Sequence, residues 1–229
     1  MSSLSTESQP SPVFLVIGEP QNGKSEVRKT ISGLTSLKGA SCSDVIYEKL
    51  AEHEGTTVES LKIQPKESVR PRLIALGDWL CGKGGPEAAH AYPRLASFRR
   101  HPSALVMTLF ESGHRIIDGI RRREELGAAI EMIASAGHQP AVLFVDRPGI
   151  NRVPDNTEHL RDMADVTIVN NGSKLDLGNK VAAYLNASFA RPSELYLTAN
   201  PGTPASRVSG RPPLVAPDSM PFGGFQHAV

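Results

Sequence analysis

The feature that most constrains this chain is the stretch at residues 13–25, V-F-L-V-I-G-E-P-Q-N-G-K-S, where an apolar run enters a glycine-containing loop. The loop fits G-x-x-x-x-G-K-[ST] without a mismatch, which is the pattern of a phosphate-binding P-loop between a strand and a helix. Gly18 and Gly23 let the backbone close tightly, so that N–H groups from about Asn22 to Ser25 point toward a polyphosphate. The following helix adds its positive end. A chance glycine turn is the alternative interpretation.

Each residue at the end of this loop has its own expected role. We expect Lys24 to reach the β- and γ-phosphates of a nucleotide as a mobile cation, and the Ser25 hydroxyl to complete the shell of a magnesium ion. Glu26, which opens the following helix, joins the expected nucleotide-binding residues. Because a P-loop indicates only that a nucleotide is bound, the reaction has to be inferred from the other residues.

Composition excludes several classes of function. The chain has 25 Lys and Arg against 24 Asp and Glu, and a net charge of +1 gives no general attraction to nucleic acid or a membrane surface. Cys42 and Cys81 are the only cysteines and lack C-x-x-C spacing, which supports neither a disulfide framework nor a zinc site. No apolar run approaches the roughly 18 residues of a membrane span, and the start of the chain lacks a signal pattern. We therefore expect a cytoplasmic protein.

Short apolar runs alternate with helical patterns along the chain. Strands are expected near residues 13–17, 40–42, 115–118, 141–145 and 166–169. Helices are expected at 26–34, from an N-cap at Ser43 or Asp44 to Gly55, at 57–63, after Pro65, and at 87–96, 103–112, 121–136 and 173–189. This alternation predicts the α/β class: a three-layer P-loop NTPase fold with a parallel sheet of about five strands and helices on both faces.

One domain, residues 13–190, accounts for most of the chain, after a flexible N-terminus at 1–12. Within this domain, residues 43–112 form a helical insertion long enough to hold an acceptor, and residues 146–158 are expected to form a lid. Residues 191–229 are rich in proline and glycine without periodicity, which favours a disordered or partner-docked tail.

Ligands of an open parallel sheet bind beyond the carboxyl ends of its strands. The residues expected at those ends, besides the P-loop, are Ser43, Asp44, Asp118, Arg147, Asn170 and Asn171. Asp118 ends a strand where an acid can hold the magnesium shell together with Ser25. Its alternative role, as the N-cap of the next helix, is compatible with the first.

Arginines supply the positive charge that phosphoryl transfer requires around the moving group. Six of them could face one cleft: Arg70, Arg72, Arg121, Arg122, Arg147 and Arg152. Arg72 and Arg122 are more simply explained as solvated charges on helix faces, whereas Arg121 and Arg147 follow strand ends. In the insertion, Trp79, Tyr92 or Phe98 could stack on a base.

Five segments taken in order carry a resemblance: G-E-P-Q-N-G-K-S, R-P-R-L-I-A-L-G-D-W-L, R-I-I-D-G-I-R-R-R-E-E-L, V-D-R-P-G and A-D-V-T-I-V-N-N-G-S. In this order they resemble the bacteriophage-type deoxynucleoside monophosphate kinases, within the wider adenylate kinase and dephospho-coenzyme A kinase group of P-loop folds. The resemblance covers roughly residues 13–185. It implies an enzyme of deoxynucleotide biosynthesis that uses ATP and Mg²⁺, in the host cytoplasm if the source is viral.

The resemblance also implies roles for single residues after the third strand. Asp118 and Arg121, in D-G-I-R, match the family's acid and acceptor-binding arginine. The adenylate kinase pattern D-G-F-P-R would instead put that arginine at Arg122. The lid departs from the richly basic lids of the family, because Arg147 and Arg152 are its only arginines before Arg161.

The stretch after the last expected strand, N-N-G-S, leaves two interpretations open. Asn170 and Asn171 fall where relatives approach the donor adenine. The other interpretation is a strand-to-helix turn with Ser173 as the N-cap.

The leading prediction is transfer of the γ-phosphoryl group of magnesium-bound ATP to a (deoxy)nucleoside monophosphate. The predicted catalytic residues are Lys24, Arg121, Arg147 and Arg152, and the predicted metal ligands are Ser25 and Asp118. The nucleotide-binding set is Gly18, Asn22, Gly23, Lys24, Ser25, Glu26, Asn170 and Asn171. The substrate-binding set is Ser43, Asp44, Arg70, Arg72, Asp78, Trp79, Asp118 and Arg121.

Other functions remain open from the sequence. A P-loop kinase for a nucleoside or dephospho-coenzyme A needs the same donor site, and a protein that uses ATP only for assembly needs no acceptor. A regulatory GTP-binding protein predicts D-x-x-G and N-K-x-D, where this chain has D-G-I-R and S-K-L-D. The accepted base and sugar, and whether the protein is a homodimer, are left open.

Overall fold

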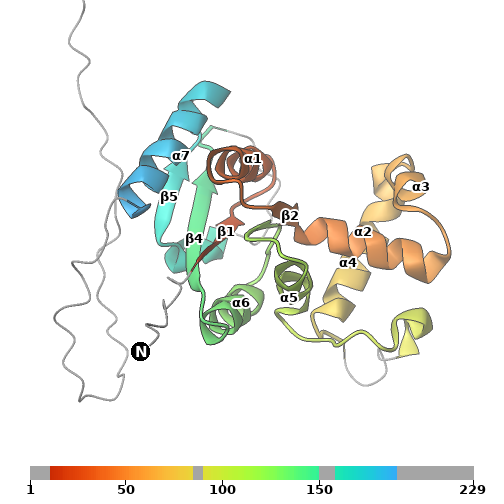
Figure 1. Ribbon diagram of the computed structural model, residues 1–229. Coiled ribbons are helices and arrows are strands. Elements are labelled where there is room, and N and C mark those ends of the chain that lie inside the picture. Colours follow the sequence, from red (N-terminus) through yellow and green to blue (C-terminus); the bar gives the residue numbers. More distant parts are fainter. Residues whose placement is uncertain (1–10, 85–89, 150–157, 190–229) are drawn as a thin grey trace, which may run out of the picture.

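The computed structural model describes residues 11–84, 90–149 and 158–189 (Figure 1). Its strands are β1 (Pro12–Ile17), β2 (Gly39–Ser41), β3 (Ile116–Asp118), β4 (Gln139–Asp146) and β5 (Val166–Val169). Its helices are α1 (Lys24–Thr35), α2 (Cys42–Glu54), α3 (Val58–Lys62), α4 (Lys66–Leu80), α5 (Ala104–Glu111), α6 (Arg123–Ser135) and α7 (Lys174–Phe189), with short 3₁₀ helices at Pro93–Leu95 and Glu158–Met163.

The five strands form one parallel sheet in the order β2-β3-β1-β4-β5. Asp118, the last residue of β3, lies beside Val16 on one side and Ser41 on the other. All five strands therefore end at one edge of the sheet, where β1 enters the P-loop. The predicted α/β class, with about five parallel strands and helices on both faces, is confirmed.

Alternate side chains of the strands build a separate core on each face of the sheet. Phe14 and Val16 of β1 pack with Val27 and Ile31 of α1 and with the buried face of α7. Leu15 of β1 points the other way, into the core that α5 and α6 cover. Figure 1 shows the resulting layers, with α1 and α7 on one side of the sheet and α5 and α6 on the other. The inner strands β1, β3 and β4 are buried on both faces over most of their apolar residues, which explains their continuous apolar runs.

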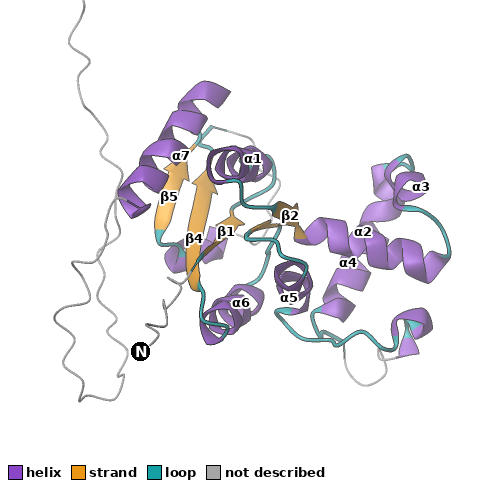
Figure 2. Cartoon of the chain, in the orientation of Figure 1, coloured by secondary structure: helices purple, strands orange, loops and turns teal. Residues whose placement is uncertain are grey.

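The segment between β2 and β3 forms a helical lobe, defined here as α2, α3, α4 and the loop that follows them (Figure 2). Leu76, Trp79 and Leu80 of α4 are buried against α2, and their cluster continues into the core beneath α5 and α6. The lobe is thus joined to the sheet by shared apolar packing. Within the described residues, the expected helix at 87–96 is wrong, because residues 91–96 contain only the short 3₁₀ helix Pro93–Leu95.

The helix start after β2 also differs from the expectation. Ser41 is the N-cap of α2: its hydroxyl accepts from the Ser43 N–H, and Asp44 accepts from the Ser41 N–H, which completes a capping box. The strand and the helix share this residue without a loop, so the cap lies two positions before the expected Ser43. Gly55 ends the helix as expected, in the left-handed conformation.

Several predicted segments fall outside the described residues. They are most of the N-terminus, at 1–10, residues 150–157 of the predicted lid, and the tail beyond 190. Among the helices that are described, none has the length and apolar character needed to cross a membrane.

Candidate functional site

The loop between β1 and α1 is shaped by its two glycines. Gly18 has a φ of 139°, and a Cβ at this position would lie 2.4 Å from the Val145 carbonyl oxygen. Gly23, with a φ of 98°, is the N-cap of α1, and a Cβ there would lie 2.6 Å from Nδ2 of Asn170. Both positions combine a left-handed backbone with a close neighbour, so that only glycine fits.

Two asparagines brace the P-loop against the neighbouring strands. The buried Asn22 side chain donates through Nδ2 to the Val145 carbonyl of β4, at 2.9 Å. Asn170, which follows β5, donates through Nδ2 to the Asn22 carbonyl at 2.9 Å, and its own N–H donates to the Asp146 carbonyl. The loop is therefore fixed in place by the ends of β4 and β5. Asn170 was predicted to approach the donor adenine, and in the structure its side chain is hydrogen-bonded to the P-loop backbone.

Lys24 folds back across the loop. Its Nζ donates to the carbonyl oxygens of Gly18 and Glu19, at 2.7 Å each. The ammonium thus lies within the turn that the backbone makes. Phosphate oxygens carry negative charge and accept stronger hydrogen bonds than neutral carbonyls, so the lysine can exchange these contacts for a phosphate group.

Asp118 lies at the end of β3, buried beside the P-loop strand, and it has a partner that the sequence did not reveal. Nε of Arg28, one helical turn after Lys24, donates to Oδ2 of Asp118 at 2.9 Å. The same guanidinium donates to the Gly39 carbonyl at 3.2 Å. In the sequence, the spacing of four residues between Lys24 and Arg28 indicates that both lie on one face of the helix. Asp118 is therefore held at the edge of the sheet by a cation from α1.

The predicted metal ligands fit a magnesium ion in chemistry. Ser25 is exposed in the first turn of α1, and Asp118 uses Oδ2 for Arg28 while no hydrogen bond within the described residues occupies Oδ1. Magnesium is usually bound through one or two protein oxygens, phosphates and water. A hydroxyl and one carboxylate match that pattern. No group of three potential metal-ligating side chains occurs within the described residues, so a site made by protein alone is not formed there.

The two arginines after β3 have different surroundings. Arg122 forms ion pairs with Asp78 of α4 and with Glu125 of α6. The Arg121 side chain is exposed, and no side-chain hydrogen bond or ion pair holds it within the described residues. Its backbone N–H donates to Glu125. Among the described residues, the Arg121 guanidinium thus has no side-chain partner, whereas that of Arg122 is paired with two carboxylates.

The predicted residues of the helical lobe divide in the same way. Arg70 is exposed on α4, without a side-chain partner in the described part of the chain. Arg72 pairs with Glu54 of α2 at 2.5 Å and donates to Gln64, which ties the lobe together. Trp79 is only 3% exposed and packs in the core, so its ring is not available as a surface for a base. Ser43 and Asp44, at the start of α2, belong to the helix cap.

Charged side chains at the end of β4 lie close to the P-loop. NH1 of Arg147 reaches the Gln21 carbonyl at 3.4 Å, which places a second cation at the loop. Asp146 pairs with Arg161 at 2.9 Å, and the Arg161 guanidinium stacks over Phe144. The predicted lid residue Arg152 lies outside the described residues.

The segment between β5 and α7 is organised as a helix start. Ser173 and Asp176 cap α7 reciprocally, since the Ser173 N–H and hydroxyl both donate to Oδ2 of Asp176 and the Asp176 N–H donates to the Ser173 hydroxyl. These hydrogen bonds lower the pKa of Asp176. The capping role counts against Asp176 as a guanine-binding acid. Asn171, also predicted to bind nucleotide, accepts instead from Lys180 at 2.7 Å.

Glu26, the last residue of the predicted nucleotide-binding set, lies in the first turn of α1. Its carboxylate pairs with Lys174 of α7 at 3.6 Å, and both side chains are partly or largely exposed. The pair links the starts of the two helices beside the P-loop.

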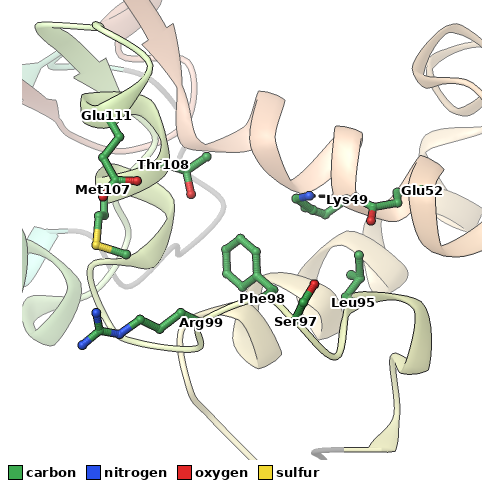
Figure 3. A pocket seen from close by; sticks show the side chains of 9 residues that line it. All are labelled: Lys49, Glu52, Leu95, Ser97, Phe98, Arg99, Met107, Thr108 and Glu111. Atoms are coloured by element: carbon green, nitrogen blue, oxygen red, sulfur yellow. Dashed lines mark hydrogen bonds and ion pairs between the residues drawn. The ribbon is translucent and has the colours of Figure 1, made fainter.

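A cavity of about 250 Å³ opens on the helical lobe, at some remove from the P-loop residues, none of which lines it. Figure 3 shows the Phe98 ring pointing into this cavity, with Lys49 on the α2 side and Thr108 on the α5 side. Lys49 lies over the Phe98 ring at 5.8 Å from its centroid. Phe98 was expected to stack on a base, but it lines a space built by the lobe and α5 instead of the P-loop edge.

Comparison with known proteins gives structural likeness only. No protein-family model matches the sequence, and no curated protein matches it either. The structure is similar to shikimate kinase from Aquifex aeolicus vf5, with a TM-score of 0.44 and 14% identity over 77% of this chain and 98% of that one. It is also similar to APS kinase CysC of Mycobacterium tuberculosis in complex with AMPPNP and APS, with a TM-score of 0.41 and 13% identity over 78% and 99%.

A third similar structure is dephospho-CoA kinase from Campylobacter jejuni, with a TM-score of 0.39 and 15% identity over 76% of this chain and 95% of that one. At these identities and TM-scores, the likenesses assign no activity, substrate or residue role to this chain.

Proposed function

We propose that this protein is a nucleotide kinase that transfers the γ-phosphoryl group of Mg-ATP to a (deoxy)nucleoside monophosphate. The observation that carries the proposal is the braced P-loop, with Lys24 folded into it, at a sheet edge that also holds Asp118 and Arg121, an exposed arginine without a side-chain partner among the described residues. Such a reaction needs no side chain as a nucleophile, because positioning and charge neutralisation supply most of the catalysis.

In this proposal the P-loop binds the donor nucleotide. The backbone amides from Asn22 to Ser25 and the start of α1 would bind the phosphates, and Lys24 would leave the Gly18 and Glu19 carbonyls to contact the β- and γ-phosphates. Arg147 lies close enough to the loop to neutralise charge on the transferred group. Ser25 and Asp118 are the residues that would hold a magnesium ion, which would supply positive charge to offset that of the phosphates.

The acceptor would lie between the sheet edge and the helical lobe. Arg121 offers five N–H donors in a planar arrangement that suits a phosphate, and the described part of the chain offers it no competing carboxylate. Arg70, on the exposed face of α4, is the second candidate for this phosphate. The lobe is inserted between β2 and β3, so it can approach the edge where both strands end.

A coupled assay of ADP release tests the proposal. The purified protein is incubated with Mg-ATP and each of the common ribonucleoside and deoxyribonucleoside monophosphates, and in parallel with nucleosides and dephospho-coenzyme A. We expect turnover that depends on one or more monophosphates. Turnover only with a nucleoside or dephospho-coenzyme A would replace the acceptor class and keep the donor site. Tight ATP binding without turnover on any acceptor would contradict the kinase assignment.

A further inference from the structure

We propose that Asp78, Arg122 and Glu125 form a tether that fixes the loop between β3 and α6 to the end of α4, and that this tether positions Arg121 for the acceptor phosphate. The inference rests on the proposed function, because Arg121 is taken as the acceptor-binding arginine. The three tether residues are positioning residues and have no assigned contact with substrate.

The guanidinium of Arg122 is the centre of the tether. One of its nitrogens, NH2, pairs with Oδ1 of Asp78 near the end of α4, and the other, NH1, donates to Oε1 of Glu125 in the first turn of α6 at 2.7 Å. The Arg122 side chain is 24% exposed and that of Glu125 only 10%. The Arg122–Glu125 pair is partly withdrawn from water and is therefore screened less than a surface pair, whereas the Asp78 side chain is 40% exposed and its pair with Arg122 is screened more.

Glu125 adds a further contact through its carboxylate. Oε2 accepts from the Arg121 backbone N–H at 3.2 Å. The Cys81 thiol, at the C-cap of α4, lies close enough to the same carboxylate for Glu125 to influence its pKa. Burial and the nearby Glu125 raise the pKa of Cys81, which keeps the thiol protonated. One buried carboxylate thus lies near the end of α4 and contacts the Arg122 guanidinium and the backbone of Arg121.

The Arg121 backbone is therefore held in place, while its side chain is exposed and has no partner among the described residues. Arg121 is held at its N–H and flanked by the engaged Arg122, while its own guanidinium is exposed. Holding the backbone reduces the freedom that an acceptor would otherwise have to remove, which is the usual gain from preorganisation. Because Asp78 and Cys81 belong to α4, the tether also links this loop to the lobe on which Arg70 lies.

Two isosteric variants of the full-length protein test the tether, Asp78→Asn and Glu125→Gln. Glu54→Gln is the matched control, because it removes an ion pair of α4 that lies outside the tether, the pair between Arg72 of α4 and Glu54 of α2. Asp78→Glu keeps the charge and should restore much of the lost function. Two measurements are made on each protein: the KM for the best monophosphate with the dissociation constant for ATP, and amide hydrogen exchange over residues 76–83 and 117–124.

For Asp78→Asn and Glu125→Gln we expect acceptor KM to rise about tenfold or more, ATP affinity to stay within about twofold, and exchange in the two segments to become faster. Glu54→Gln should leave acceptor KM, ATP affinity and hydrogen exchange in the two segments near their wild-type values. Unchanged exchange would overturn the tether itself. Faster exchange with an unchanged acceptor KM, or an equal loss of ATP and acceptor binding, would overturn the positioning role. If the wild type turns over no monophosphate, the proposed function fails, and the positioning role with it. The exchange measurement then decides the tether separately.

Discussion

Lys24 is the residue on which donor chemistry depends most directly. Its ammonium donates to the Gly18 and Glu19 carbonyls, and Lys24 belongs to neither apolar core. We therefore expect Lys24→Met to lower turnover by about 10²–10³-fold, since a preorganised cation is lost, while the melting temperature changes little. Single-turnover kinetics and a thermal melt check this. A variant with near-normal turnover would remove Lys24 from the reaction.

Arg121 and Arg122 should respond differently to the same substitution. Arg121→Met should raise acceptor KM while leaving ATP affinity and stability near wild type, because the Arg121 side chain is exposed and forms no hydrogen bond or ion pair with the described residues. Arg122→Met should also lower stability, because it leaves Asp78 and the buried Glu125 without their cation. Urea unfolding measured beside the kinetics separates the two. Equal destabilisation by both variants would contradict the distinction.

The sequence predicted the position of the P-loop better than the hydrogen-bond partners of single residues. The P-loop pattern located Gly18, Gly23 and Lys24, because the spacing itself carries the mechanism. Arg28 was missed, since its partner Asp118 lies 90 positions away, and the spacing of four from Lys24 indicates a shared helix face without indicating what that face contacts. The choice between Arg121 and Arg122 depended in the same way on Asp78, which is 44 positions from Arg122.

Among the elements, the start of α7 offers a test of capping. Ser173→Ala removes the hydroxyl that accepts from the Asp176 N–H, and we expect the melting temperature to fall by about 2–4 °C, the usual effect of a lost N-cap in a chain of this size. The folded state lowers the pKa of Asp176, so its contribution to stability is present above the unfolded pKa and is lost as pH falls through the folded pKa. Asp176→Asn should therefore flatten that part of the pH dependence of the melting temperature. An unchanged profile would contradict this.

Strands were easier to predict than the helical lobe. The inner strands β1, β3 and β4 contain short apolar runs buried on both faces, so composition alone indicates them, and the edge strand at residues 166–169 was predicted with the observed bounds. The lobe has no sheet to impose a pattern. Residues 90–96 were expected to be helical, yet Tyr92 has a non-helical backbone there and its ring centroid lies 5.1 Å from that of Trp79. Tertiary packing decided the conformation of this segment, and such packing cannot be read from local sequence.

At the scale of the whole molecule, the two cysteines report on the junction between lobe and sheet. Cys42 lies where β2 meets α2, Cys81 ends α4, and both are free and buried in one continuous core. Burial raises the pKa of both thiols, so neither forms a thiolate at neutral pH. We expect Ellman's reagent to react slowly with the native protein and rapidly with two thiols in guanidinium chloride. Rapid reaction of one thiol in the native protein would show that the junction opens readily.

The hydrogen bonds of Asn22 and Asn170 to the P-loop affect the expected rate at which the proposed donor, ATP, would bind. The loop is held to β4 and β5 by hydrogen bonds that need no ligand, so its conformational entropy is already lost when the chain folds. The proposed nucleotide would therefore bind to a preformed loop. The adjustment expected there is a change of rotamer at Lys24, which takes place within nanoseconds. Association should consequently be limited by diffusion and orientation, with any slower step arising where the lobe meets the second substrate.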